Sequence, residues 1–213
     1  YGITAIRFED DTFTTNKKRV FEICDEIEKR GLNIEWEART RTDIIDDAMY
    51  TRMREVGLVR LQVGVESVSA DGLSSMNKSV DPDVYSDFFR SIRQADLGLI
   101  ITVIIGVPNE HPQQMLDTIS WVQSRLTQKD RFIRCMFTPF PGTPMHSYGV
   151  SYQVLSDDLS KYTMDIPLVV SDNFSYEDLV KVKEIADIVM TQHGPEHTSD
   201  YPVPTWDELH ESI

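Results

Sequence analysis

One pattern repeats along the chain and limits the folds that it can adopt. Three charged, amphipathic segments each end in a glycine followed by leucine and run directly into apolar residues: "KRGLNIEW", "REVGLVRL" and "ADLGLIIT". We predict that Gly31, Gly57 and Gly98 each adopt the left-handed conformation that ends a helix, where a side chain would clash. A strand-prone run follows each glycine, and the segments before the glycines have the apolar spacing of helices.

The alternation of strand and helix determines the expected fold class, which is α/β. Strands are predicted to begin near five residues: Ile3, Leu32, Val59, Ile100 and Phe132. Because strands that alternate with helices of this length form βαβ units, we predict a sheet of parallel strands with right-handed crossovers.

Local signals place several helix boundaries. Asp43 is predicted to be the N-cap of one helix, and Pro82 to lie in the first turn of another. Residues 176–192 are predicted to form a late helix, and the tail after it to lie on the surface or to be partly disordered. We therefore divide the chain into residues 1–150, which hold the alternating units, and residues 151–213, a helical extension and tail.

Charge and cysteine content narrow the expected partners. The formal net charge of −14 disfavours both nucleic acid and anionic membranes as partners. No stretch is apolar and long enough to cross a bilayer. The two cysteines, Cys24 and Cys135, lie far apart in the sequence, which is typical of reduced thiols, and we expect a cytoplasmic protein.

Polar residues gather where the predicted strands end. In parallel α/β folds, ligands bind outside the carboxyl ends of the strands. The residues at these ends are Glu9, Asp10 and Asp11, then Glu37, Arg39 and Arg41, then Glu66 and Ser67, then the runs "GVPNE" and "TPFPGT". Each residue taken singly is best explained as a helix cap or a turn, but five such strand ends together indicate a ligand site.

The same segments resemble those of a known family. The runs "YGITAIRFEDDTFTTNKKR", "EARTRTDIID", "MREVGLVRLQVGVESVS", "MNKSV", "IIGVPNE" and "FTPFPGTPM" occur in the order and spacing of radical S-adenosylmethionine (radical SAM) proteins. They are most similar to the branch that also binds cobalamin, and the resemblance covers roughly residues 1–145. It implies a partial (β/α)6 TIM-like barrel, with the second to sixth strands in residues 1–150.

The resemblance also implies that residues of its first two motifs contact the methionine end of S-adenosylmethionine. Asp10 and Asp11 correspond to groups that face the methionine end of S-adenosylmethionine, where a carboxylate pairs with the ammonium. Arg41, or less favourably Arg39, corresponds to a partner of the methionine carboxylate.

The later motifs imply contacts with the nucleoside. Glu66 and Ser67 correspond to a motif that contacts the methionine carboxylate and the ribose hydroxyls. Gly106, Val107 and Pro108 correspond to the motif that lies along the adenine, where backbone groups make most of the contacts. No residue of this chain is assigned to catalysis or to a metal.

One defining motif of the family is absent from this chain. The Cys-x-x-x-Cys-x-x-Cys loop that holds the [4Fe-4S] cluster follows the family's first strand, and neither Cys24 nor Cys135 can replace its thiolates. We therefore expect a fragment that lacks the first βα unit and is inactive alone. The parent enzyme would cleave S-adenosylmethionine for radical chemistry or for methyl transfer through cobalamin. Its substrate would be a small molecule or a peptide.

Two other functions stay open at this point. The chain could be a non-enzymatic α/β binding or assembly module, or a barrel enzyme that binds Mg²⁺ through Glu9, Asp10, Asp11 and Glu66. Because the first strand of the family's barrel is missing, residues 3–8 would present an unpaired strand edge, so we expect a homodimer through this edge or slow aggregation.

Overall fold

The computed structural model describes residues 2–78, 82–147, 152–192 and 202–211 of the chain. Its first part alternates strands and helices as predicted. The elements are β1 (Ala5–Arg7), α1 (Lys17–Lys29), β2 (Glu35–Thr40), α2 (Asp47–Glu55), β3 (Leu58–Glu66), α3 (Ala70–Ser75), α4 (Pro82–Gln94), β4 (Gly98–Ile105), α5 (Pro112–Gln123) and β5 (Arg131–Met136).

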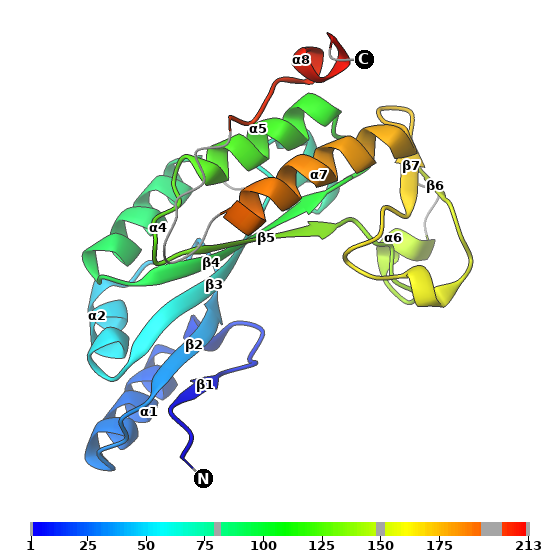
Figure 1. Cartoon of the computed structure of the whole chain (residues 1–213). Helices are drawn as coiled ribbons and strands as arrows, with labels where there is room; N and C mark the ends of the chain where they lie inside the picture. Colours follow the sequence, from blue (N-terminus) through cyan, green and yellow to red (C-terminus); the bar gives the residue numbers. More distant parts are fainter. Residues whose placement is uncertain (1, 79–81, 148–151, 193–201, 212–213) are drawn as a thin grey trace. The chain divides into compact units, whose positions relative to one another are not determined.

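These strands form one five-stranded sheet in the order β1-β2-β3-β4-β5, so that each strand lies beside the next one in the chain (Figure 1). The pairs β1–β2 and β2–β3 are parallel, with Ile6 opposite Trp36 and Ala38 opposite Leu61. Sequential parallel strands joined by helices are the arrangement of a (β/α) barrel. The predicted partial TIM-like barrel is therefore confirmed.

The chain after β5 contains more than the predicted helix and tail. A short helix α6 (Pro144–Ser147) precedes β6 (Tyr152–Val154), which pairs in antiparallel fashion with β7 (Val169–Ser171). The sequence analysis did not predict this pair. The late helix α7 (Tyr176–Gln192) has the predicted bounds, and α8 (Trp206–Glu211) follows it.

The chain divides into two compact units, which are described one at a time. Unit 1 comprises Tyr1–Gly64, Val80–Ile101 and Thr127–Arg131. Its core centres on the fully buried Trp36, whose ring centroid lies 5.4 Å from that of Phe8 and 5.6 Å from that of Phe13. Trp36 Nε1 donates a hydrogen bond to the Val56 carbonyl at 2.9 Å.

Alternation along β2 separates the core of unit 1 from a charged face. Trp36, Ala38 and Thr40 are buried, whereas Glu37 and Arg39 are only partly covered. Because successive side chains of a strand point to opposite faces of the sheet, Glu37 and Arg39 project from the face opposite Trp36. This face carries the ion pairs that are described below.

Unit 2 comprises Val65–Ser79, Thr102–Leu126 and Phe132–Ile213. Helix α5 packs against α7 and α8. The Trp206 amide at the start of α8 donates to Gln113 Oε1 at 2.6 Å, and the Lys181 ammonium lies 5.9 Å from the centroid of the Trp206 ring. Helix α8 of the predicted tail thus lies on α5, and residues 193–201 fall outside the described parts. No helix in these parts combines the length and apolar content needed to cross a membrane.

Two local predictions were wrong. The N-cap of α2 is Asp46, whose side chain accepts a hydrogen bond from the Met49 amide at 2.9 Å, whereas Asp43 pairs with Arg41. Gly98 does not end a helix, because Asp96 takes the left-handed conformation with φ 57°. Gly98 is instead the first residue of β4, where a Cβ would overlap the Lys129 carbonyl. Gly31 and Gly57 have the predicted positive φ, at 61° and 99°.

Candidate functional site

Two of the three adjacent acids after β1 are held by arginines of unit 1. Glu9 pairs with Arg39 at 2.7 Å and with Arg7 at 3.2 Å. Asp10 pairs with Arg19 of α1 at 2.8 Å, and Asp11 is exposed. These pairs reduce the repulsion between neighbouring carboxylates. Because exposed ion pairs contribute little stability, a ligand's charged groups can replace them at small cost.

Arg41 also has a partner within its own segment. Its guanidinium donates two hydrogen bonds to the Asp43 carboxylate, at 2.9 Å and 2.7 Å. These hydrogen bonds raise the pKa of Arg41, so the group stays charged. The pair is exposed to solvent. The two parallel N–H donors of Arg41 that bind Asp43 can bind any other carboxylate in the same way.

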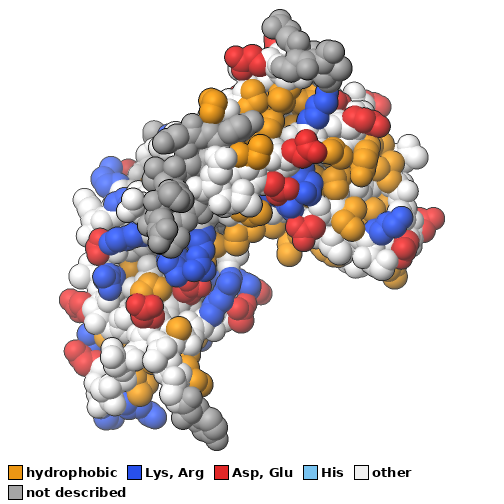
Figure 2. Space-filling view, in the orientation of Figure 1, with side chains coloured by type: hydrophobic (Ala, Val, Ile, Leu, Met, Phe, Trp, Pro, Cys, Tyr) orange, Lys and Arg blue, Asp and Glu red, His pale blue; other side chains and the backbone are white. Residues whose placement is uncertain are grey.

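The carboxylates of the described residues do not converge on a metal site. No group of three or more His, Cys, Asp or Glu side chains lies in a metal-holding arrangement within the described parts. Over the face drawn in Figure 2, basic side chains lie beside acidic ones, in agreement with the many ion pairs of the chain.

An unusual backbone conformation lies at the carboxyl end of β3. Glu66 has φ 65°, a conformation that residues other than glycine rarely adopt. The Ser67 amide donates to the Val65 carbonyl at 2.8 Å, which closes a three-residue γ-turn around Glu66. With positive φ this turn is rare and strained, and such strain costs of order 1–3 kcal/mol. Strain of this kind gathers at ligand sites.

The turn directs two neighbouring side chains differently. The Glu66 side chain is 17% exposed and pairs with the Lys78 ammonium at 3.0 Å. Ser67 is fully buried, and its hydroxyl donates to Glu110 Oε1 at 2.5 Å. Ser69 donates its hydroxyl to the same carboxyl oxygen at 2.6 Å.

Glu110 is a residue whose importance the sequence analysis missed. It closes the run "GVPNE", and its exposed fraction is 0%. Its Oε2 atom has no hydrogen-bond partner among the described residues. Burial raises the pKa of Glu110, more than the hydrogen bonds from Ser67 and Ser69 lower it. The available sequence signal was an acid in the turn after a buried strand, but Ser67 lies 43 positions away along the chain.

The remaining predicted residues of unit 2 form the turn after β4. Gly106 has φ 88°, and a Cβ there would lie 3.2 Å from the Leu179 side chain. Val107 is fully buried, and its carbonyl accepts from the Glu110 amide at 3.0 Å. The Pro108 carbonyl accepts from Asn173 Nδ2 at 3.3 Å. The turn that carries these three residues therefore also carries Glu110, which joins it to the end of β3.

The residues of the chain fit S-adenosylmethionine better than they fit an iron–sulfur cluster. Unit 2 brings Glu66, Ser67 and residues 106–108 together through Glu110, so the segments that the family resemblance assigns to the nucleoside are joined to one another. The cluster requires three thiolates, and the chain has two cysteines. Burial raises the pKa of Cys24 to about 11 and also raises that of Cys135. These thiols do not fit a cluster.

Comparison with known proteins gives a consistent picture. The chain matches the family model described as "Radical SAM superfamily" over residues 1–122. It is 31% identical over 183 residues to an uncharacterized methyltransferase of Pyrococcus horikoshii, an alignment that covers 85% of this chain and 39% of the relative. The chain thus spans less than half the length of this curated relative.

Two solved structures share the fold. The radical S-adenosylmethionine methyltransferase TsrM from Kitasatospora setae, with cobalamin and a [4Fe-4S] cluster bound, aligns with a TM-score of 0.61 at 15% identity, over 73% of this chain and 32% of that chain. Coproporphyrinogen III oxidase (HemN) from Escherichia coli, described as a radical SAM enzyme, aligns with a TM-score of 0.63 at 16% identity, over 89% of this chain and 41% of that chain. At such identities the likeness concerns the fold.

Proposed function

This chain belongs to the radical SAM superfamily, and we propose that it forms the S-adenosylmethionine-binding part of a radical SAM enzyme. The reaction of the parent enzyme is proposed to be radical chemistry or methyl transfer. Methyl transfer is supported by the methyltransferase of Pyrococcus horikoshii, to which the chain is 31% identical. A proposed role for cobalamin is supported by the TsrM structure, and no part of this chain is assigned to it.

The observation that carries this proposal is the strained turn at the end of β3. Glu66 has a positive φ, which residues other than glycine rarely adopt, and its mostly buried side chain keeps 17% exposure. A strained residue persists where the surrounding structure enforces it, commonly at ligand-binding positions. Glu66 is therefore proposed to accept hydrogen bonds from the ammonium or the ribose hydroxyls of the cofactor, after its pairing with Lys78 is released.

The other predicted residues receive distinct proposed roles. The Ser67 hydroxyl already donates to Glu110, so Ser67 is proposed to orient the turn and to offer its backbone. Residues 106–108 are proposed to lie along the adenine. For Asp10, Asp11 and Arg41 of unit 1, the roles that the family resemblance implies toward the ammonium and the methionine carboxylate stay predictions.

The chemistry of the parent enzyme needs groups that this chain does not hold. S-adenosylmethionine supplies a reactive sulfonium when it is bound, but the thiolate ligands of the cluster are not among the residues of this chain. We therefore propose that the isolated chain is inactive. The substrate is proposed to be a small molecule or a peptide, and the compartment the cytoplasm, since Cys24 and Cys135 are both free thiols.

Calorimetric titration of the chain with S-adenosylmethionine tests the binding proposal. Without the cluster contacts we expect a Kd of about 0.1–1 mM. The variant Glu66→Gln keeps the size of the side chain but removes its charge, and it should bind about tenfold more weakly, because a charge-assisted hydrogen bond is lost. The exposed Asp157→Ala variant of the same unit is the matched control and should bind like the wild type.

Equal affinities of the wild type and Glu66→Gln would show that the turn is not part of the site. Absence of any heat signal up to several millimolar ligand would contradict the proposed function as a whole. Circular dichroism of each variant separates loss of binding from loss of folding.

A further inference from the structure

We propose that Glu110 is a positioning residue, whose buried carboxyl group fixes the strained turn at Glu66 in the shape that receives S-adenosylmethionine. This inference rests on the proposed function, since it concerns the same turn. It assigns to Glu110 the task of holding the turn, without contact to the cofactor.

The geometry makes Glu110 the common anchor of two residues of the turn region. The hydroxyl groups of Ser67 and Ser69 both donate to Glu110 Oε1, at 2.5 Å and 2.6 Å. The Ser69 amide donates in turn to Ser67 Oγ at 2.9 Å. A single carboxyl oxygen therefore holds the chain directly after Glu66, where the sheet hydrogen bonds of β3 have ended.

Two further contacts brace the same stretch. The Val68 amide donates to Thr118 Oγ1 of α5 at 3.1 Å, and the Gly72 amide donates to Ser69 Oγ at 2.9 Å. Gly72 leaves room for the anchor, because a Cβ at this position would overlap the Glu110 carboxyl group. Side chains from distant segments thus hold residues 67, 68 and 69 in succession, as a strained turn requires.

Two hydroxyl donors require an acceptor at this buried place, and a carboxyl group supplies it. Glu110 is 0% exposed, and the charged group that faces it is Asp71 of α3, which adds repulsion to any ionised form. The raised pKa favours the neutral acid, which carries its proton on an oxygen and still accepts both hydroxyl hydrogen bonds on the other. The substitution Glu110→Gln would preserve the same acceptor without the ionisation.

The experiment compares three variants of the full chain by S-adenosylmethionine titration and by amide hydrogen exchange of residues 65–69. Glu110→Ala removes the anchor, so we expect about tenfold weaker binding and about tenfold faster exchange in this stretch. Glu110→Gln keeps the acceptor and should rescue both readouts to within about threefold. Val122→Ala, a buried truncation in α5, should lower stability and leave both readouts near the wild-type values.

A pH profile separates the anchor from ordinary packing. The pKa of Glu110 is raised in the folded chain, so its contribution to stability is complete below the unfolded value of about 4.5 and declines as pH rises through the folded pKa. Unfolding midpoints of the wild type should therefore fall relative to those of Glu110→Gln as pH rises from about 4 to 8.

The outcomes distinguish this inference from the proposed function. Unchanged exchange and unchanged affinity in Glu110→Ala would overturn the positioning role. If the wild type and Glu66→Gln bind S-adenosylmethionine equally but Glu110→Ala still frees the turn, the proposed site fails and with it the cofactor part of this inference. Failure of Glu110→Gln to rescue either readout would also overturn the proposal.

Discussion

At the scale of single residues, the buried carboxyl groups of Asp130 and Glu110 differ in how many of their oxygens are hydrogen-bonded. Asp130 of unit 1 is fully paired: its two oxygens accept from Arg93 at 2.9 Å and 2.6 Å, from the Leu99 amide at 2.6 Å, and from the amide and hydroxyl of Thr127 at 2.7 Å and 2.9 Å. Glu110 of unit 2 leaves one oxygen without a partner among the described residues. Saturated pairing at both oxygens is typical of a structural role, whereas Glu110 holds the hydroxyls of Ser67 and Ser69 through a single oxygen.

The saturated environment of Asp130 leads to a stability prediction. The variant Asp130→Ala leaves the Arg93 guanidinium and the Leu99 and Thr127 amides without their acceptor, so the free energy of unfolding should fall by about 3–5 kcal/mol. Asp130→Asn, which keeps one acceptor oxygen, should cost about 1–3 kcal/mol. Urea unfolding at pH 7 gives both values.

A matched control is the exposed pair of Arg90 and Asp87, which lie 2.7 Å apart in α4. Asp87→Ala should change the free energy of unfolding by less than about 1 kcal/mol, because exposed ion pairs contribute little. Equal losses from the buried and the exposed variants would refute the account of Asp130.

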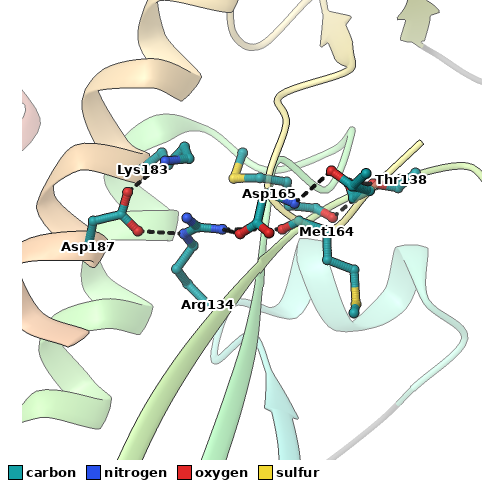
Figure 3. A network of polar contacts seen from close by, with 8 residues as sticks. Arg134, Thr138, Met164, Asp165, Lys183 and Asp187 are labelled. Carbon is teal, nitrogen blue, oxygen red and sulfur yellow. Dashed lines mark hydrogen bonds and ion pairs between the residues drawn. The ribbon is translucent and has the colours of Figure 1, made fainter. Parts of the chain in front are cut away.

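At the scale of secondary-structure elements, one arginine joins three segments of unit 2. Arg134 of β5 donates to Asp187 of α7 at 2.7 Å, to Asp165 at 2.7 Å and to the Met164 carbonyl at 3.2 Å (Figure 3). Burial alone would lower the pKa of Arg134, but its two carboxylate partners outweigh burial and raise it. Arg134 therefore ties the connection between β6 and β7 to the sheet and to α7.

This network predicts which part of the chain loosens first. Arg134→Met keeps an apolar stem but removes every donor, so amides of residues 162–166 should exchange about tenfold faster with solvent. The same segment keeps the hydrogen bond from the Met136 amide to the Met164 carbonyl at 2.8 Å, so it should loosen without unfolding. Hydrogen exchange with mass spectrometry at neutral pH measures the effect.

Lys183→Met provides the control for this prediction. Lys183 pairs with the other oxygen of Asp187 at 2.6 Å, and this ion pair includes neither Asp165 nor Met164. The variant should leave exchange in residues 162–166 at the wild-type rate. Equal acceleration in both variants would mean that Asp187, and not Arg134, holds the segment.

At the scale of the whole molecule, the sheet order leaves β1 at one end of the sheet. All three residues of β1 are exposed, as is Ile3 at 63%. An uncovered strand edge offers unpaired backbone groups that a second copy can satisfy. The homodimer that the sequence led us to expect therefore remains a prediction, and β1 with Ile3 is the surface through which it would form.

Light scattering coupled to size exclusion tests this prediction at about 50 µM protein, a concentration at which a micromolar dimer forms. We expect a dimer for the wild type and a larger monomer fraction for Ile3→Lys/Ile6→Lys, because lysine on an edge strand discourages pairing. Leu159→Lys alters an equally exposed apolar residue in unit 2 and should remain dimeric. A monomeric wild type would rule out the edge contact.

The sequence by itself determined the features that depend on neighbouring residues. Apolar periodicity predicted the order of strands and helices and both bounds of α7, and the glycines at 31 and 57 were correctly predicted to have positive φ. The family resemblance, which rests on the order of short motifs, also needed no tertiary contact and is confirmed by the match over residues 1–122. Local spacing and backbone sterics suffice for features of this kind.

The tertiary structure decided whatever depends on contacts between distant segments. Asp43 and Asp46 are equally good N-caps by composition, and only the folded backbone selects Asp46. The role of Glu110 could not be predicted, since its partner Ser67 lies 43 positions away, nor could that of Arg134, which is 53 positions from Asp187. The physical reason is that desolvation and hydrogen bonding of a buried charge depend on which remote groups surround it, and only the packed chain brings those groups together.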